Sequence, residues 1–332
     1  MSRAGTVGLT LGKFAPLHRG HQLVIETALR ETEHVLVDIY PAAETNVPLA
    51  IRANWIRALY PDVEVIEAWD GPTAVGYTPD VTKLLHGRGV THFFSSEPYG
   101  DHVSRALGAR DRRVDTERRA VPISGTAVRQ SAFDCRAFVH PVVYRDLVAR
   151  VVLVGAPSTG KTTLAAALAK HYATVWMPEY GREYWATHNI ERRLTLGQLL
   201  EIAEGHRERE ETTVLEANRF LFVDTEAIIT SLFSRHYHQA VHPRLAQLAN
   251  ESATRYDLFL LCDTDIPYDD TPDRSGEANR ELFQAWICDE LASRKIPYVT
   301  LRGSVDERLR RATRVLDGFT KYRSLAEQLL EG

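Results

Sequence analysis

The segment VVLVGAPSTGKTT, residues 151–163, restricts the fold of this chain more than any other part of it. Four apolar residues lead into a glycine-rich loop, and the apolar residues that follow recur at helical spacing up to residue 171. The loop has the spacing G-x-x-x-x-G-K-[ST], in which backbone amides surround phosphate groups. Because such a loop needs a buried strand before it and a helix after it, this part of the chain is predicted to be an α/β domain.

The same alternation of short apolar runs and longer amphipathic stretches extends through the whole chain. Strands are predicted at residues 6–11, 34–40, 63–68, 92–95, 151–154, 219–223, 258–262 and 298–301. Helices are predicted at residues 21–31, 51–60, 81–87, 102–107, 162–171, 196–215, 277–294 and 306–316. The two series predict an α/β protein with two doubly wound parallel-sheet domains, residues 1–147 and 148–332.

Composition narrows the class of protein. With 332 residues, of which 44% are hydrophobic and 25% charged, the chain suits two globular domains. A net charge of −4 argues against nucleic acid as the main partner, so the arginine clusters at 110–113, 118–119 and 308–314 are predicted to be solvated. No apolar run is long enough for a membrane helix, and the three cysteines form no C-x-x-C pair. The sequence therefore predicts a cytoplasmic protein with no membrane partner.

The segment GKFAPLHRGH, residues 12–21, joins the first predicted strand to the first predicted helix. Gly12 and Gly20 allow the backbone to approach a ligand closely. His18 and His21 are three residues apart, so one turn of helix or a tight loop presents both imidazoles to the same place. Beside the positive end of a helix dipole, two imidazoles can bind phosphate oxygens and stabilise the charge that grows on them.

A second segment, ISGTAVR at residues 123–129, comes much later in the first half. Together with the pattern G-x-F-x-P-x-H-x-G-H, it resembles the nucleotidylyltransferase superfamily, whose first segment binds ATP and aids attack on the α-phosphorus. The resemblance implies that Arg129 contacts the β- and γ-phosphates and that Lys13 adds positive charge near them. The implied catalytic residues are Lys13, His18, His21 and Arg129, and the implied ATP-binding residues are Gly12, Phe14, Gly20, Ser124 and Thr126.

The glycine-rich loop of the second half predicts a phosphate site with a metal ion. Lys161 is expected to reach the β- and γ-phosphate oxygens, and the Thr162 hydroxyl is expected to bind Mg²⁺. Asp224 follows the strand predicted at 219–223, where an acid can hold Mg²⁺ or its waters; a helix N-cap is the alternative. The remaining ATP contacts are predicted at Gly155, Ser158, Thr159, Gly160 and Thr163.

The segment MPEYGREY, residues 177–184, begins where the strand after the glycine-rich loop and its helix is expected to end. In nucleoside kinases an acid at this point often faces the hydroxyl that is phosphorylated. Glu179 is therefore the first candidate for the base or a ribose anchor, and Asp224 is the second. Tyr180 and Arg182 are predicted to contact the substrate, although Arg182 and Glu183 equally suit a surface ion pair.

The polar stretch at residues 265–274 resembles the mobile lid of a small-molecule kinase. In such a lid Arg274 or Arg280 would close on the transferring phosphate and bind ATP. A surface loop with incidental arginines is the alternative.

An adenylyltransferase signature followed by a P-loop kinase resembles the NadR-type bifunctional enzymes of NAD synthesis and salvage, over nearly the whole chain. In that family the kinase phosphorylates nicotinamide riboside, and the transferase joins nicotinamide mononucleotide (NMN) to the AMP of ATP. The resemblance implies ATP, nicotinamide riboside, NMN and NAD as ligands and Mg²⁺ as cofactor. Many relatives also carry an N-terminal DNA-binding domain. This chain begins at the transferase strand, so repressor activity is not expected of it alone.

The same resemblance places the contacts to the acceptor nucleotide. Arg52, Asn54 and Trp55 lie where transferases of the superfamily recognise the acceptor, and Glu97 and Tyr99 follow the fourth predicted strand. An aromatic ring can stack on a pyridinium ring. A position in the core is nevertheless the simpler interpretation of Trp55.

Several alternatives remain open at this point. The acceptor can be another nucleotide-like molecule, such as a flavin or pantetheine phosphate, or the transferase half can be silent and only sense nucleotides. A nucleotide-gated regulator is the alternative outside the enzymes, and acceptor-dependent ADP formation separates it from them. The sequence also leaves open the oligomeric state, a homo-oligomer included, and the choice between nicotinamide and nicotinic acid substrates.

Overall fold

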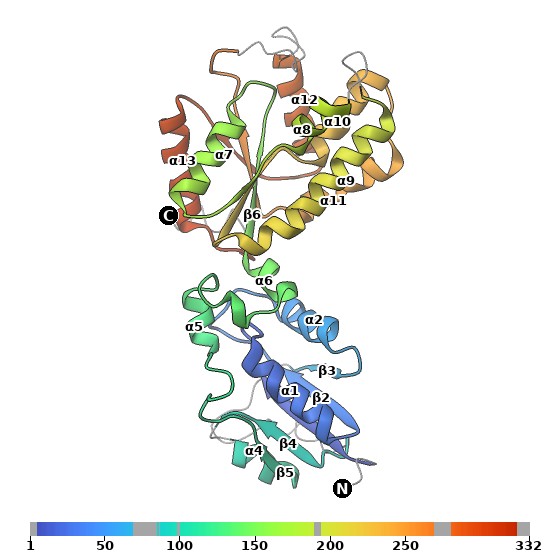
Figure 1. Cartoon of the computed structure of the whole chain (residues 1–332), viewed down its shortest axis with the longest axis vertical. Helices are drawn as coiled ribbons and strands as arrows, with labels where there is room; N and C mark the ends of the chain where they lie inside the picture. The colour runs from blue at the N-terminus through green and yellow to red at the C-terminus, as the bar shows by residue number, and fades with distance from the viewer. Residues whose placement is uncertain are drawn as a thin grey trace. The chain divides into compact units, whose positions relative to one another are not determined.

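The computed structural model describes residues 5–68, 85, 87–97, 100–188, 194–268 and 280–323. The chain divides into two compact units, Met1–Asp146 and Leu147–Gly332. Each unit contains a five-stranded parallel sheet with helices packed on it (Figure 1), which confirms the predicted pair of doubly wound α/β folds. No helix in the described ranges has the length and apolar character needed to cross a membrane.

The first unit has the strand order β3-β2-β1-β4-β5. Its strands are β1 (Val7–Gly12), β2 (His34–Ile39), β3 (Glu64–Glu67), β4 (His92–Ser95) and β5 (Arg110–Arg113). Its helices are α1 (Arg19–Glu31), α2 (Leu49–Leu59), α4 (Gly100–Leu107), α5 (Gly125–Gln130) and α6 (Pro141–Leu147), with a 3₁₀ turn at Arg136–Phe138. Because β1 pairs with β2 on one side and β4 on the other, the strand order reverses at β1. Open parallel sheets bind ligands at such a reversal, beside the carboxyl ends of the strands.

The second unit repeats this plan with the order β10-β9-β6-β8-β7. Its strands are β6 (Ala149–Val154), β7 (Trp176–Met177), β8 (Phe220–Asp224), β9 (Leu258–Cys262) and β10 (Tyr298–Leu301). Its helices are α7 (Lys161–His171), α8 (Tyr180–His188), α9 (Leu196–Thr213), α10 (Ala227–His238), α11 (Pro243–Arg255), α12 (Arg280–Ser293) and α13 (Val305–Gly318), with a 3₁₀ turn at Val214–Glu216. The order reverses at β6, which pairs with β8 and β9 and leads directly into the glycine-rich loop.

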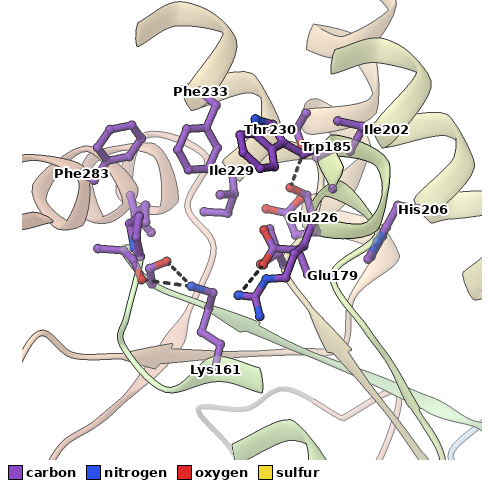
Figure 2. Close-up of a pocket in the computed structure, with 18 of the residues that line it drawn as sticks. Lys161, Glu179, Trp185, Ile202, His206, Glu226, Ile229, Thr230, Phe233 and Phe283 are labelled. Atoms are coloured by element: carbon purple, nitrogen blue, oxygen red, sulfur yellow. Dashed lines mark hydrogen bonds and ion pairs between the residues drawn. The ribbon is translucent and has the colours of Figure 1, made fainter. Parts of the chain in front are cut away.

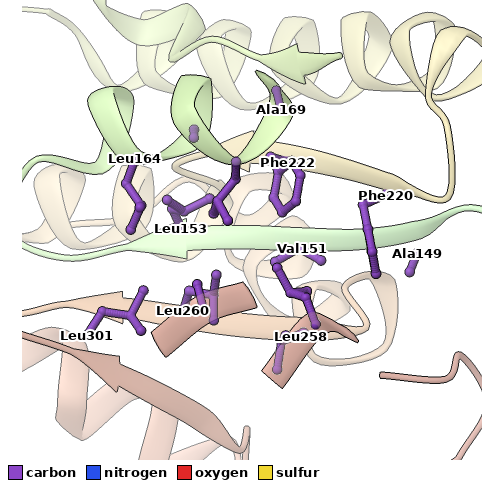
Figure 3. Packing of buried hydrophobic residues seen from close by; sticks show 14 of the residues in the cluster. Ala149, Val151, Leu153, Leu164, Ala169, Phe220, Phe222, Leu258, Leu260 and Leu301 are labelled. Carbon is purple, nitrogen blue, oxygen red and sulfur yellow. The ribbon is translucent and has the colours of Figure 1, made fainter. Parts of the chain in front are cut away.

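Apolar side chains of β6, β8 and β9 form the main core of the second unit together with α7 and α13. Figure 3 shows Leu153 of β6 and Phe222 of β8 in the layer between the sheet and α7, to which α7 contributes Leu164. These three side chains are almost completely buried, and each contributes about 2 kcal/mol by leaving water. This packing holds the first turn of α7, and with it the glycine-rich loop, at the end of β6.

The sequence analysis missed three helices of the second unit, α8, α10 and α11. Helix α8 starts with Tyr-Gly, and glycine is a poor helix former. Helix α10 starts with Ala-Ile-Ile-Thr, whose β-branched residues suit a strand equally well. Helix α11 has its start signals, a His242 cap and a proline in the first turn, but they were not recognised.

The arginine cluster at 110–113 is exposed or partly exposed, as predicted for a solvated face, but it also forms a strand that was not predicted. It forms β5, an edge strand that pairs with β4. Arg112 bonds Glu31 at 2.9 Å, and Arg113 bonds Asp111 at 2.7 Å. Charged side chains on an edge strand hinder pairing with other chains, which accounts for so polar a strand.

Candidate active sites

A cavity of about 390 Å³ opens in the first unit at the carboxyl end of β1. The predicted residues that line it are Gly12, Lys13, Phe14, His21, Glu97, Ser124, Thr126 and Arg129. The two sequence motifs of this half therefore meet in one place, although the second comes from α5 and the loop before it. A Cβ atom on Gly125 would lie 3.2 Å from Nη1 of Arg129 and 3.9 Å from Nε2 of His18, so the start of α5 packs against the first motif.

The two histidines of the first motif stack on each other, with ring centroids 3.8 Å apart. Nδ1 of His18 accepts a hydrogen bond from the amide of Gly20 at 3.1 Å, and Nδ1 of His21 accepts one from the amide of His18 at 3.4 Å. Each ring therefore carries its proton on Nε2 and can donate from that atom. A Cβ atom on Gly20 would come within 3.0 Å of the His18 ring, which explains the glycine there.

Both histidines are neutral at pH 7. Burial, with Arg118 and Arg129 nearby, lowers the pKa of His18 to about 4. Burial, with His18 and Arg118 nearby, also lowers the pKa of His21 well below its ordinary value. The pair thus offers two uncharged N–H donors, and the positive charge of the site comes from arginine and lysine side chains.

Arg129 is held at this cavity by hydrogen bonds, whereas Lys13 is exposed. Nη1 of Arg129 donates to the carbonyl of Ala15 at 2.7 Å, and Nη2 donates to the hydroxyl of Thr126 at 3.1 Å. The hydroxyl of Ser124 caps α5 by accepting from the amide of Ala127 at 3.2 Å. Lys13 is exposed and forms an ion pair with Glu44, which also lines the cavity.

Arg118 is exposed, as predicted for a solvated cluster, and it also lines the same cavity. Its Nη2 lies 3.3 Å from Oε1 of Glu97. The loop is fixed by Asp115, whose carboxylate accepts from the amides of Arg119, Ala120 and Val121 at 2.8 to 3.0 Å. An aspartate at the start of a polar turn was the signal in the sequence.

The predicted acceptor-binding residues of α2 mostly serve the fold. Arg52 is buried and donates to the carbonyls of Val47 and Tyr40, both at 3.1 Å. Trp55 is 1% exposed, and its Nε1 donates to Asp146 at 2.7 Å, as the core interpretation predicted. Neither is among the described residues that line the cavity, and Asn54 is exposed on the surface of α2. Tyr99 lies outside the described residues.

The glycine-rich loop of the second unit has the geometry that its sequence predicts. Gly160 has a φ of +78°, and a Cβ atom on Gly155 would lie 2.6 Å from the carbonyl oxygen of Cys262, so both positions require glycine. Nζ of Lys161 donates to the carbonyls of Gly155 and Ala156 at 2.9 and 3.0 Å. The ammonium group therefore lies across the mouth of the loop, where phosphate oxygens would bind.

Thr162 and Asp224 meet at the end of this loop. The Thr162 hydroxyl donates to Oδ2 of Asp224 at 2.5 Å, and Asp224 is completely buried at the carboxyl end of β8. A hydroxyl and a carboxylate are the hard oxygen ligands that Mg²⁺ prefers, and phosphates and waters normally complete its shell. The residues present thus fit a magnesium ion, even though the described residues contain no cluster of three metal-binding side chains.

Two buried arginines donate hydrogen bonds to backbone carbonyls of the glycine-rich loop. Arg280 donates to the carbonyls of Ser158 and Ile266 at 3.0 and 2.8 Å, and Arg308 donates to the carbonyl of Thr159 at 2.6 Å. Arg280 was predicted to close on the phosphate from a lid, but here it supports the loop. Arg308 was predicted to be solvated and is 2% exposed, so that prediction was wrong. Arg274 lies outside the described residues.

A cavity of about 650 Å³ extends from the loop into the space between helices; it is called the acceptor cavity below. The P-loop residues that line it include all those predicted to bind ATP, from Gly155 and Ser158–Thr163. Figure 2 shows Trp185, Phe233 and Phe283 around the end of the cavity away from Lys161. The sequence analysis did not place these rings in a site.

Two of the predicted substrate residues line the acceptor cavity. Glu179 is partly exposed, and its Oε2 lies 3.7 Å from Nη2 of Arg182 (Figure 2). Tyr180 is not among the lining residues; its ring instead lies 4.0 Å under the guanidinium of Arg209. Arg182 stays a substrate candidate; it pairs with Glu179, whereas Glu183 pairs with Arg209 at 2.6 Å, so the alternative of an Arg182–Glu183 ion pair was wrong.

Glu226, two residues after Asp224, is a buried carboxyl group in the acceptor cavity that the sequence analysis did not identify. Its Oε2 accepts from the amide of Ile228 at 2.9 Å and from the hydroxyl of Ser252 at 2.5 Å. Its Oε1 has no hydrogen-bond partner in the described part of the chain. Burial raises the pKa of Glu226 to about 7, against the opposing effects of Ser252 and Ile228.

We expect Glu226→Gln to remove a pH dependence of stability. The folded chain keeps the Glu226 proton up to about pH 7, whereas the unfolded chain releases it near the ordinary pKa of 4.5. The contribution of this group to the free energy of unfolding therefore falls by about 3 kcal/mol as the pH rises through this window, and is constant above it. In calorimetry, the stability of the variant relative to the wild type should be higher at about pH 8 than at about pH 5. If the free energies of unfolding of the variant and the wild type differ by the same amount at both pH values, the prediction is contradicted.

His206 of α9 lines the same cavity and was also missed. The ring bonds to the backbone of Thr225, the residue before Glu226, and burial lowers the pKa of His206 to about 4. Nε2 of His206 is buried and has no hydrogen-bond partner in the described ranges.

The two units match different family models. Residues 9–131 match the cytidylyltransferase-like family, and residues 150–308 match an AAA domain. Over 324 residues the chain is 26% identical to the trifunctional NAD biosynthesis/regulator protein NadR of Escherichia coli (strain K12), covering 89% of this chain and 78% of that protein. The NadR protein of Salmonella typhimurium is also 26% identical, over 328 residues, covering 90% of this chain and 80% of that protein.

Solved NadR structures share the fold of the whole chain. A NadR structure in complex with NAD and AMP-PNP matches with a TM-score of 0.60 and 22% identity, over 96% of this chain and 98% of that one. A NadR structure in complex with NR matches with a TM-score of 0.61 and 23% identity, over 97% of this chain and 99% of that one. Similar to NadR over nearly its whole length, the chain is an enzyme of nucleotide metabolism with a cytidylyltransferase-like domain followed by an AAA-type P-loop domain.

Proposed function

We propose that this chain makes NAD from nicotinamide riboside in two ATP-dependent steps. The second unit phosphorylates the riboside to NMN, and the first unit transfers AMP from ATP to NMN and releases pyrophosphate. The observation that carries this proposal is that each unit has a glycine-containing strand-to-helix turn that lines a cavity at the strand reversal of its own sheet. The matching NadR structures are complexes with NAD and AMP-PNP and with NR, which supports the choice of substrates.

In the second unit, a hydroxyl oxygen of the riboside attacks the γ-phosphorus of ATP, ADP leaves, and the hydroxyl proton passes to a base. Glu179 is the first candidate for that base because it lines the acceptor cavity close to the P-loop. Lys161 neutralises charge on the transferring phosphoryl group. Mg²⁺, when held by Thr162 and Asp224, would neutralise the β- and γ-phosphates. The aromatic rings of Trp185, Phe233 and Phe283 suit a flat pyridinium ring at the far end.

In the first unit, a phosphate oxygen of NMN attacks the α-phosphorus of ATP and pyrophosphate leaves. The Nε2–H groups of His18 and His21 can donate to the oxygens of the reacting phosphate, on which charge grows. Arg129, fixed by Ala15 and Thr126, adds a positive charge beside them. This chemistry needs positioning and charge neutralisation but no covalent intermediate.

The two half-reactions can be measured separately. We expect ADP formation that depends on nicotinamide riboside, and pyrophosphate release that depends on NMN, both with Mg²⁺ and ATP. Riboflavin phosphate and pantetheine phosphate serve as control acceptors for the second assay. If pyrophosphate is released with either control acceptor and not with NMN, that molecule is the acceptor and NMN is not. ATP hydrolysis without any acceptor requirement would favour a nucleotide-gated regulator.

We expect Arg308→Met to raise the KM for ATP in riboside phosphorylation roughly tenfold, because it leaves the Thr159 carbonyl unpaired and frees the P-loop to shift. Steady-state ADP formation measures this. Arg311→Met, on the exposed face of the same helix, is the matched control and should match the wild type. Equal KM values for the two variants would show that Arg308 does not position the loop.

A further inference from the structure

Strands β6 and β9 stop pairing at the point where the glycine-rich loop begins. The last residues that pair are Val154 of β6 and Leu261 of β9. Beyond them the ladder of hydrogen bonds between the two strands ends, although the backbone is still buried there. A buried backbone amide or carbonyl needs a hydrogen-bond partner, so the groups that follow the last pair must find one elsewhere.

The side chain of Gln284 on α12 supplies these partners. Its Oε1 accepts from the amide of Ala156 at 2.9 Å, and its Nε2 donates to the carbonyl of Cys262 at 3.1 Å. Gln284 is buried, and so are both bonds. The reverse placing of oxygen and nitrogen would set donor against donor and acceptor against acceptor. The side-chain amide thus bridges the two strands where their own pairing ends.

The bond to Ala156 also determines where a carbonyl points. The amide of Ala156 and the carbonyl of Gly155 belong to one peptide group, and the N–H and C=O of a trans peptide point in opposite directions. That carbonyl accepts from Nζ of Lys161 at 2.9 Å (Figure 2). Because Gly155 has no Cβ atom, it offers little resistance of its own to rotation of this peptide. Gln284 therefore aims one of the two carbonyls that bind Lys161.

The other supports of the loop act at different peptides. The two buried arginines donate to carbonyls later in the loop. The Thr159 hydroxyl donates at 2.8 Å to the carbonyl of Ala156, which belongs to the next peptide group. Loss of the Gln284 side chain therefore frees the first peptide of the loop and leaves these contacts in place.

We infer that Gln284 is a positioning residue for phosphoryl transfer in the second unit: it fixes the Gly155–Ala156 peptide, and this peptide holds the Lys161 ammonium at the mouth of the loop. The inference rests on the proposed function, because it concerns the same transfer from ATP. Gln284 is not among the described residues that line the acceptor cavity. Its effect on the reaction passes through Lys161, and no contact with a substrate is assigned to it.

The first test separates kcat from KM. Gln284→Leu removes both hydrogen bonds with a side chain of comparable size. It should lower kcat for ADP formation at saturating ATP roughly 10- to 100-fold, because the Lys161 ammonium shifts from the transferring phosphate. The KM for the nucleoside should change less than about twofold. Gln247→Leu, the same substitution at an exposed glutamine of α11, is the matched control and should leave both constants unchanged.

A double-mutant cycle separates positioning from a general loss of structure. If Gln284 acts through Lys161, adding Gln284→Leu to Lys161→Ala should lower kcat by less than about threefold more. Independent effects multiply, so a further 10- to 100-fold loss in the double variant would contradict the inference. Melting curves give the folded fraction of each variant, to which kcat is referred. Gln284→Met, with an unbranched side chain, replaces Gln284→Leu in the cycle if the leucine variant does not fold.

The choice of acceptors separates this inference from the proposed function. ADP formation is measured with nicotinamide riboside, with other ribonucleosides and with water as the only acceptor. If the riboside does not react but ADP formation with another acceptor shows the expected loss and cycle, the proposed substrate is wrong and the role of Gln284 stands. If the riboside is phosphorylated and Gln284→Leu keeps the wild-type kcat, or the two losses multiply, the role of Gln284 is wrong and the proposed function stands. If no acceptor gives ADP, both are overturned.

Discussion

Replacing Lys161 by alanine should lower the rate of riboside-dependent ADP formation by roughly 1000-fold or more. The Lys161 ammonium lies within 3.0 Å of the carbonyls of Gly155 and Ala156, at the mouth of a loop whose carbonyls accept hydrogen bonds from Arg280 and Arg308. No other described lysine lines the acceptor cavity, and Arg182, which also lines it, is paired with Glu179.

The control for this variant lies in the same chain. Lys161→Ala should adenylylate added NMN at the wild-type rate, because the first unit has its own cavity. Lys170→Ala, at the last turn of the same helix and exposed, should behave as the wild type in both assays. A loss of less than about tenfold in Lys161→Ala would mean that the loop does not bind the transferring phosphate.

Replacing His18 by alanine should lower pyrophosphate release from ATP and NMN by roughly 100- to 1000-fold. The variant loses one of the two N–H donors and also the cap that orders the first turn of α1. His18→Asn restores a capping side chain but does not restore a donor at the position of Nε2. It should therefore recover stability without recovering the rate. Rate recovery in His18→Asn would reduce the role of His18 to capping.

The pH profile adds an independent check on this site. Since the pKa of His18 is about 4, the rate should not fall as the pH rises from about 6 to about 8. A fall centred near 6.5 would instead show that a charged imidazole is needed. His34→Ala, at the exposed start of β2, is the matched histidine control and should leave both rate and profile unchanged.

The parts of the structure that were predictable from the sequence are those with a strong local signal. Strands 92–95, 258–262 and 298–301 agree with β4, β9 and β10 at both ends, because each is a short apolar run between polar residues. The P-loop was predictable in the same way, since its glycines are required by the backbone itself.

The residues that escaped prediction act through distant partners. Arg308 looks like a surface arginine in α13, and only the fold brings it to Thr159 of the P-loop. Arg118 sits in a charged turn whose approach to the histidine pair depends on the loop that Asp115 fixes. Glu226 directly precedes a stretch with β-branched residues, and His206 lies in a long polar helix. Neither position has a local sequence pattern that marks a site. A sequence pattern records local spacing and cannot show which side chains a fold buries together.

The most direct test of the central claim is a time course with the purified chain, Mg-ATP and nicotinamide riboside as the only pyridine compound, followed by chromatography of the products. Sequential action of the two units predicts that NMN appears first and that NAD then forms from it. NMN that accumulates without NAD, or the absence of both products, would contradict the claim that one chain carries both steps.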